Sequence, residues 1–171
     1  MKNSNLLTAA IISLGILFLI FCFCTRTVSP SDKNMRSVHS EVLDGDVWIP
    51  AAMTVISDGS SMLRAEGTRD SVTGRVSILT IETGRSDMKA QQESWERADS
   101  AEKYVCAGTR IKLFRKPGEK SWNRAEEFIA FIDKGGSWCC VRVFQPVGVK
   151  DCSLQNFAQV VLGVDMVTAK H

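Results

Sequence analysis

The sequence predicts an α+β fold in which an antiparallel sheet of about six to seven strands packs with one long central helix and one C-terminal helix, after an N-terminal transmembrane helix. Two observations lead to this prediction. The chain of 171 residues begins with a long apolar segment. Beyond it, runs of strand-like patterns are interrupted by isolated helical patterns, an order typical of α+β proteins. Hydrophobic residues make up 44% and charged residues 23% of the chain, which excludes bulk disorder.

The apolar segment covers residues 6–24, nineteen residues without a charge. A helix of that length spans about 28 Å, close to the hydrocarbon core of a bilayer. Lys2 resembles the basic start of a signal peptide, and Cys22 and Cys24 stand where a cleavage site has small residues. Because the segment is longer than a cleaved apolar region, we expect an uncleaved signal anchor in a bacterial inner membrane. A cleaved periplasmic form is the alternative.

Residues 25–40 are polar, contain Pro30 and show no apolar period, so we expect a tether before a single domain at 41–171. Two signals for orientation oppose each other. Three basic residues within the tether favour a cytoplasmic domain. A short basic region before a long apolar stretch is, however, the usual arrangement for export. We expect the domain to face the periplasm.

The first half of the domain shows strand patterns at 47–50, 52–56, 61–65 and 75–82, with turns at 57–60 and 71–74. The stretch 75–82 is apolar on both faces over part of its length, which predicts a central strand. The next segment, 86–104, has a helical period and predicts the long helix. The apolar residues on its face are Met88, Trp95, Ala98, Ala101 and Tyr104.

The second half shows strand patterns at 109–115, 124–132 and 137–145. Pro117-Gly118 and Gly135-Gly136 mark the turns between them, which indicates an antiparallel meander. The stretch 151–164 then predicts the C-terminal helix. Its apolar face consists of Phe157, Val160, Val161 and Val164.

Three short segments follow a pattern found in known domains: 46–50 (DVWIP), 57–59 (SDG) and 153–157 (SLQNF). With them, residues 45–165 resemble the small α/β/α-type domains of the PsbP and DcrB-like superfamily. The resemblance implies an envelope or secretion-linked module that acts as a binding partner or chaperone without catalysis. It carries over no functional residue, because the shared pattern consists of apolar spacings.

Four cysteines lie beyond the apolar segment: Cys106, Cys139, Cys140 and Cys152. Behind an export-like segment, one or two disulfides are expected, each stabilising by about 2–4 kcal/mol, and the sequence does not choose among three full pairings. Buried free thiols are the alternative. Cys139 and Cys140 lack the spacer of a redox or zinc pair and point to opposite faces of a strand, which disfavours both chemistries.

Other chemistries are also disfavoured. His39 and His171 are the only histidines, which argues against histidine-rich metal sites and hydrolytic triads. Glu126 and Glu127 are adjacent in a strand and face opposite sides, a poor geometry for a glycosidase. Residues 44–46 (DGD) lack the downstream residues of a calcium loop. No metal or cofactor is expected, and a net charge of +2 argues against nucleic-acid binding.

A basic cluster surrounds one predicted hairpin. It consists of Arg110, Lys112, Arg115, Lys116, Lys120 and Arg124, with Trp122 among them. One interpretation is a docking surface for an acidic partner or anionic lipid headgroups, with Trp122 as the exposed anchor. The other is a solvated hairpin whose charges protect a sheet edge from aggregation.

These observations predict a membrane-tethered, extracytoplasmic module that binds another protein without catalysis. An envelope or secretion accessory protein fits, as does an immunity protein that neutralises a toxin. The other expected partner is the bilayer, through residues 6–24. Two alternatives remain: a thiol–disulfide oxidoreductase that uses Cys139 or Cys140, and a cytoplasm-facing membrane adaptor.

Overall fold

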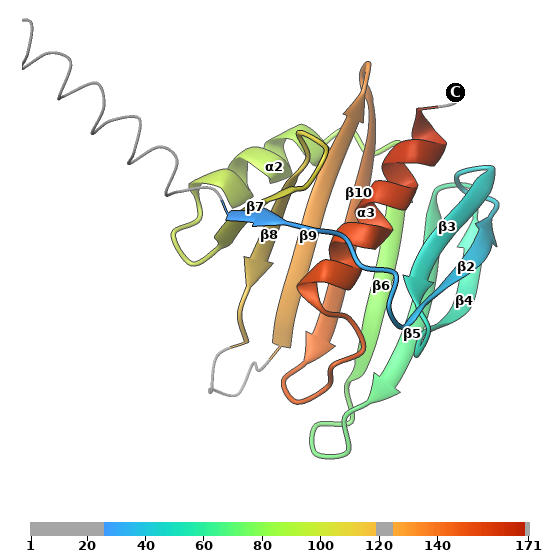
Figure 1. Cartoon of the computed structure of the whole chain (residues 1–171), viewed down its shortest axis with the longest axis vertical. Helices are drawn as coiled ribbons and strands as arrows, with labels where there is room; N and C mark the ends of the chain where they lie inside the picture. The colour runs from blue at the N-terminus through green and yellow to red at the C-terminus, as the bar shows by residue number, and fades with distance from the viewer. Residues whose placement is uncertain (1–25, 119–124, 170–171) are drawn as a thin grey trace, which may run out of the picture.

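The structure is a computed structural model that describes residues 26–118 and 125–169. Within these ranges the fold is α+β, with a large mixed sheet, a two-stranded ribbon and two helices (Figure 1). The sheet has eight strands in the order β1-β7-β8-β9-β10-β6-β5-β4. Its strands are β1 (Arg26–Val28), β4 (Thr54–Gly59), β5 (Met62–Arg69), β6 (Val76–Thr83), β7 (Glu102–Cys106), β8 (Lys112–Lys116), β9 (Ala125–Lys134) and β10 (Ser137–Pro146). The ribbon pairs β2 (Met35–Ser40) with β3 (Gly45–Pro50), and the helices are α2 (Met88–Arg97) and α3 (Leu154–Thr168).

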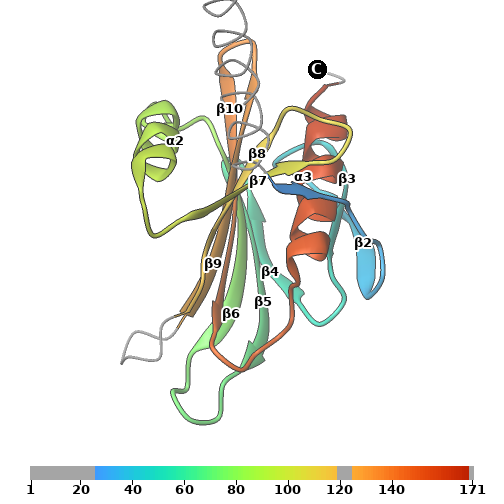
Figure 2. The ribbon, with the colours of Figure 1, turned by 60° about the vertical axis from the view of Figure 1, so that its left-hand side comes forward.

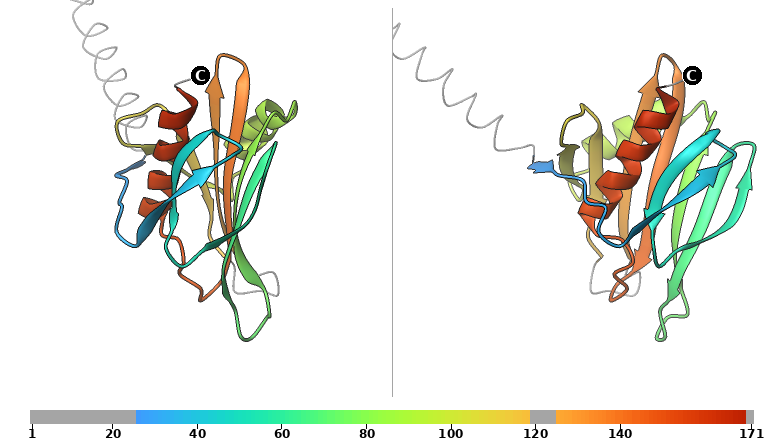
Figure 3. Two further views of the ribbon diagram at one scale, coloured as in Figure 1. Left: turned by 90° about the vertical axis from the view of Figure 1, so that its right-hand side faces the viewer. Right: turned by 45° about the vertical axis from the view of Figure 1, so that its right-hand side comes forward.

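The elements form three layers. Figure 2 shows α2 on one face of the sheet, with α3 and the ribbon on the other, and Figure 3 shows the ribbon beside α3. Successive residues of a strand point to opposite faces, so β9 supplies both cores. Phe128 and Ala130 pack on the α3 side, whereas Ile129 and Phe131 pack on the α2 side. This explains why β9 reads as a continuous apolar run.

The larger core lies between the sheet and α3. The rings of Phe128 and Phe157 stack there with centroids 5.5 Å apart. The ribbon lies close against α3: a Cβ placed on Gly45 would be 2.6 Å from Cγ1 of Val167. A side chain at residue 45 would therefore push the ribbon away from the helix.

The predicted long helix is wrong beyond Arg97. The chain turns extended at Ala98 (φ −71°, ψ 116°), and Glu102–Cys106 forms β7 in the sheet. Met88 and Trp95 do pack as predicted, against the α2 face of the sheet. Tyr104, however, is buried on the α3 side as a strand residue. Residues three apart share one face of a helix, but in the structure Ala101 packs on the α2 side and Tyr104 on the α3 side.

The expectation of a tether at 25–40 is also wrong for the described residues 26–40. β1 pairs in parallel with β7 and places Val28, 7% exposed, in the larger core. β2 pairs with β3. The parallel β1 makes the sheet mixed, where an antiparallel sheet was predicted. A three-residue strand has no periodic pattern of its own, and it exists because β7 offers it an edge.

The predicted membrane span at residues 6–24 lies outside the described residues. Among the residues that the structure does describe, no helix has the length and apolar character needed to cross a membrane.

Candidate binding site

The predicted basic docking surface is divided by the structure. Phe114 belongs to the core on the α2 side and Leu113 to the core on the α3 side, so successive β8 cations face opposite ways. Arg110 is exposed, ahead of β8. Lys120, Trp122 and Arg124 lie outside the described residues. The described cations of this cluster therefore do not form one continuous surface.

Most of these cations already have internal partners. Lys112 Nζ lies 2.8 Å from Glu96 Oε1, and this hydrogen bond holds the pKa of Glu96 below its usual value. Arg115 bridges two carboxylates, with Nε 2.6 Å from Glu126 and Nη1 3.0 Å from Glu102. Because their charge is compensated, these residues attract a distant acidic partner less strongly than the sequence suggested.

The fourth described member of the cluster, Lys116, packs on an aromatic ring. Its Nζ lies 4.0 Å from the ring centroid of Trp95, within the range of a cation–π interaction. Trp95 is itself 9% exposed. The contact ties the end of β8 to α2, so the role of Lys116 in the structure is to hold that helix.

The predicted disulfides are absent: Cys106, Cys139, Cys140 and Cys152 are all buried and free. Strand order supplies the reason. Two strands separate β7 from β10, which places Cys106 about 14 Å from the adjacent pair in β10, whereas a disulfide needs Cα atoms within about 7 Å. Cys152 bonds Gln145 through its backbone, and Gln145 lies five residues along β10 from Cys140, about 16 Å.

The cysteines are also poor nucleophiles. Burial raises the pKa of Cys139 and that of Cys140 to about 12 each. Burial likewise raises the pKa of Cys106 and of Cys152. Since the thiolate is the reactive form, these thiols are unreactive at neutral pH. The described residues also contain no group of histidine, cysteine or acidic side chains that could hold a metal ion.

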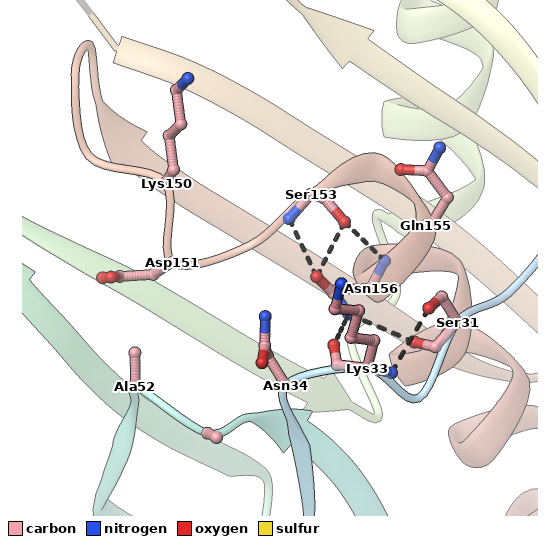
Figure 4. Close-up of a pocket in the computed structure, with 10 residues that line it drawn as sticks. Ser31, Lys33, Asn34, Ala52, Lys150, Asp151, Ser153, Gln155 and Asn156 are labelled. Atoms are coloured by element: carbon pink, nitrogen blue, oxygen red, sulfur yellow. Dashed lines mark hydrogen bonds between the residues drawn. The ribbon is translucent and has the colours of Figure 1, made fainter.

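A cavity of about 600 Å³ lies at the start of α3 (Figure 4). Its polar groups bond one another. Ser153 caps the helix by accepting from the N–H of Asn156 at 3.1 Å. The side-chain amide of Asn156 donates to the carbonyl oxygens of Ser31 at 3.2 Å and Lys33 at 2.7 Å. These hydrogen bonds of Asn156, in the wall of the cavity, hold the segment between β1 and β2 against the start of α3.

Asp151, at the edge of the same cavity, fastens a second segment. It accepts hydrogen bonds from the N–H of Thr68 at 2.6 Å and from its hydroxyl at 2.7 Å. The hydroxyl of Ser77 also donates to it. The loop before α3 is thereby bound to β5 and β6, so this carboxylate has a structural role.

A larger cavity, of about 800 Å³, lies at the opposite end of α3. We call it the loop-end cavity. Its wall comes from the β2–β3 turn, the start of α2, the β9–β10 hairpin and the end of α3. The volume falls within the range of ligand and side-chain binding sites, about 300–1,000 Å³.

The loop-end cavity combines apolar side chains with cations. Leu43, Ile132 and half-buried Trp138 line it together with Arg85, Lys89 and Lys134, and no carboxylate is among its described lining residues. Cys139 also lines it, but as a protonated thiol. This chemistry suits the binding of an apolar side chain beside an acidic one.

Two of the three cations already have carboxylate partners. Arg85 lies 2.8 Å from Asp87 and 3.0 Å from Glu82, and its hydrogen bond lowers the pKa of Asp87 to about 2. Lys134 lies 2.6 Å from Asp165. Lys89 is exposed and forms no ion pair within the described ranges, so it is the cation most available to a partner.

Sequence reasoning did not find this cavity, because its lining residues are scattered over four segments. Lys89 and Trp138 become neighbours of one cavity only when α2 and the β9–β10 hairpin meet at one end of the sheet. Comparisons with known protein families, curated proteins and solved structures find no match for this chain.

Proposed function

We propose that this protein is a membrane-tethered module that binds another protein without catalysis, and that the partner docks at the loop-end cavity. The observation that carries the proposal is the lining of that cavity. Half-buried Trp138 and exposed Lys89 border about 800 Å³ of space from two different elements. Tryptophan is the residue type most enriched at binding hot spots.

The expected partner presents an apolar side chain with an acidic neighbour. The apolar group would pack against Trp138, and the carboxylate would lie near Lys89. A toxin or a secretion component, the partners expected from the sequence, meets this description if its surface carries such a pair. The short segments that resemble PsbP and DcrB-like domains imply the same kind of role, a binding module without catalysis.

Photo-cross-linking in intact cells tests the proposal. Ser137 is exposed and lines the cavity, whereas Val72, 89% exposed, lies between β5 and β6. Figure 1 shows the β5–β6 and β9–β10 hairpins at opposite ends of the domain. A photoreactive residue at 137 should give one discrete adduct with another protein, and the same residue at 72 should not. No adduct from 137, or equal adducts from both positions, would refute docking at the cavity.

The thiol oxidoreductase alternative finds little support in the chemistry of the site. Cys139 and Cys140 are 4% and 5% exposed, and the pKa of each is raised to about 12. Redox cysteines need the thiolate and access to a partner thiol. We therefore propose a binding function, not an enzymatic one.

A cytoplasm-facing adaptor is the second candidate, and the four free cysteines favour it. Free thiols are usual in a reducing compartment, whereas exported domains commonly pair them. Protease digestion of intact spheroplasts distinguishes the two orientations. A periplasmic domain is degraded in intact spheroplasts, and a cytoplasmic domain is degraded only after lysis.

A further inference from the structure

We infer that the edge of the sheet formed by β1 and β7 lies against the membrane surface, where Arg26 and Lys103 contact anionic lipid headgroups. The inference rests on the proposed membrane tether at residues 6–24. It goes beyond the tether because it assigns a surface, an orientation and a lipid chemistry to the domain itself.

The first step concerns the short distance between the predicted span and the sheet. The span ends at residue 24, and β1 begins at Arg26. Two residue steps cover at most about 7 Å of extended chain. The headgroup layer on each side of a bilayer is about 5–7 Å thick. Arg26 must therefore lie within or directly above the headgroups.

The second step is that β1 belongs to the folded domain. Its three residues pair with Tyr104, Val105 and Cys106. The N–H of Ala107 also donates to the carbonyl oxygen of Val28 at 2.8 Å. Figure 1 shows β1 at one side of the domain beside β7. Since β1 cannot move away from the sheet without breaking these bonds, the membrane end of the chain brings β7 with it.

The third step is the charge of this edge. Arg26 and Lys103 are exposed, and neither forms an ion pair within the described ranges. Lys103 adjoins Tyr104, the register partner of Arg26, so the two Cα atoms are about 6 Å apart and the two side chains leave opposite faces of the sheet beside its edge. Lys103 helps to lower the pKa of Glu96, but Lys112 makes the direct ion pair with that carboxylate. Arg110, also exposed, follows β7 and adds a third cation.

Anionic phospholipid headgroups are the occupant that this geometry favours. Each basic residue near an anionic membrane raises the equilibrium constant for contact with the membrane about fivefold. A protein partner would have to reach the same edge through the headgroup layer. The short connection to the predicted span thus favours lipid over protein on this surface.

Lipid cross-linking of the full chain tests the inference. A photoreactive residue replaces Thr27, which is exposed in β1. The protein is reconstituted in vesicles of phosphatidylcholine alone or of phosphatidylcholine with phosphatidylglycerol. We expect lipid adducts that increase with phosphatidylglycerol and decrease with salt. Arg26→Gln and Lys103→Gln should each lower that increase about fivefold.

Lys33→Gln and Lys150→Gln are the matched controls, because both lysines are exposed and line the cavity at the start of α3. They should leave the adduct yield unchanged. Three results would overturn the inference. The adduct yield could be equal in both kinds of vesicle, the control variants could lose as much yield as Arg26→Gln and Lys103→Gln, or residue 27 could cross-link to protein and not to lipid. Alkaline extraction of the same vesicles separates the two claims. Release of the chain contradicts the tether, whereas retention without lipid adducts contradicts only the headgroup contact.

Discussion

The side-chain amide of Asn156 donates a hydrogen bond of 2.7 Å to the carbonyl oxygen of Lys33, across 123 positions of sequence. The same amide donates to the carbonyl oxygen of Ser31. Asn156 is 9% exposed. One side chain at the start of α3 therefore fixes the path of the chain between β1 and β2.

Asn156→Ala should lower the free energy of unfolding by about 1–3 kcal/mol, because it leaves two carbonyl groups without their donor. Gln155→Ala is the matched control, since Gln155 is exposed and only its backbone oxygen bonds Ser31. Chemical denaturation measures both variants, and hydrogen exchange should show faster opening at 26–40 in Asn156→Ala. Equal stability of the two variants would contradict the role of Asn156.

The free thiols predict an alkylation pattern. In the folded protein without reductant, Cys106, Cys139, Cys140 and Cys152 should resist alkylation at neutral pH, because all four are buried and protonated. After unfolding without reductant, all four should be labelled, which mass spectrometry counts. A mass showing only two labelled positions among them would reveal a disulfide and contradict the structure.

The same thiols predict a loss of stability at alkaline pH. The pKa of Cys139 is raised from 9.0 to about 12, so between these values the unfolded state releases a proton that the folded state keeps. The contribution of this thiol to the free energy of unfolding is fully present below about pH 9. It decreases as the pH rises, by about 1.4 kcal/mol per pH unit at most. Cys139→Ala should show a shallower decline from pH 9 to 11 than the wild type. An unchanged slope would contradict the raised pKa.

Lys116 should behave as a structural residue. Lys116→Ala removes the cation above Trp95 and should cost about 0.5–1 kcal/mol of stability. Arg110→Ala, at an exposed residue of the same basic cluster, should change stability by less than about 0.5 kcal/mol. Thermal unfolding compares the two. A destabilised Arg110→Ala beside an unchanged Lys116→Ala would reverse the assignment.

The fold class followed from patterns that reflect burial directly. The two-sided apolar pattern at 75–82 predicted a central strand, and β6 is buried in alternation and paired on both sides. The apolar face of the stretch 151–164 predicted the C-terminal helix, and α3 covers Leu154–Thr168. These segments carry enough apolar residues for local sequence to determine their structure.

The parts that were wrong depend on distant partners. β1 has three residues and exists through its parallel pairing with β7. The prediction that the helix continues beyond Arg97 was wrong because residues 102–106 pair in the sheet between β1 and β8. The ion pairs of the predicted docking surface were missed for the same reason, since Glu96, Glu102 and Glu126 approach its cations only in three dimensions. A charge count along the sequence does not show which charges are compensated.

The most direct measurement is the affinity of the full chain for the protein that cross-links at residue 137, with variants of Trp138 and Val72. Trp138→Ala should weaken binding by about 2 kcal/mol, roughly thirtyfold, because the cavity loses its aromatic wall. Val72→Ala, at the opposite end of the domain, should bind like wild type. Thermal unfolding must show both variants folded. If folded Trp138→Ala binds the partner as tightly as the wild type, the loop-end cavity is not the binding site.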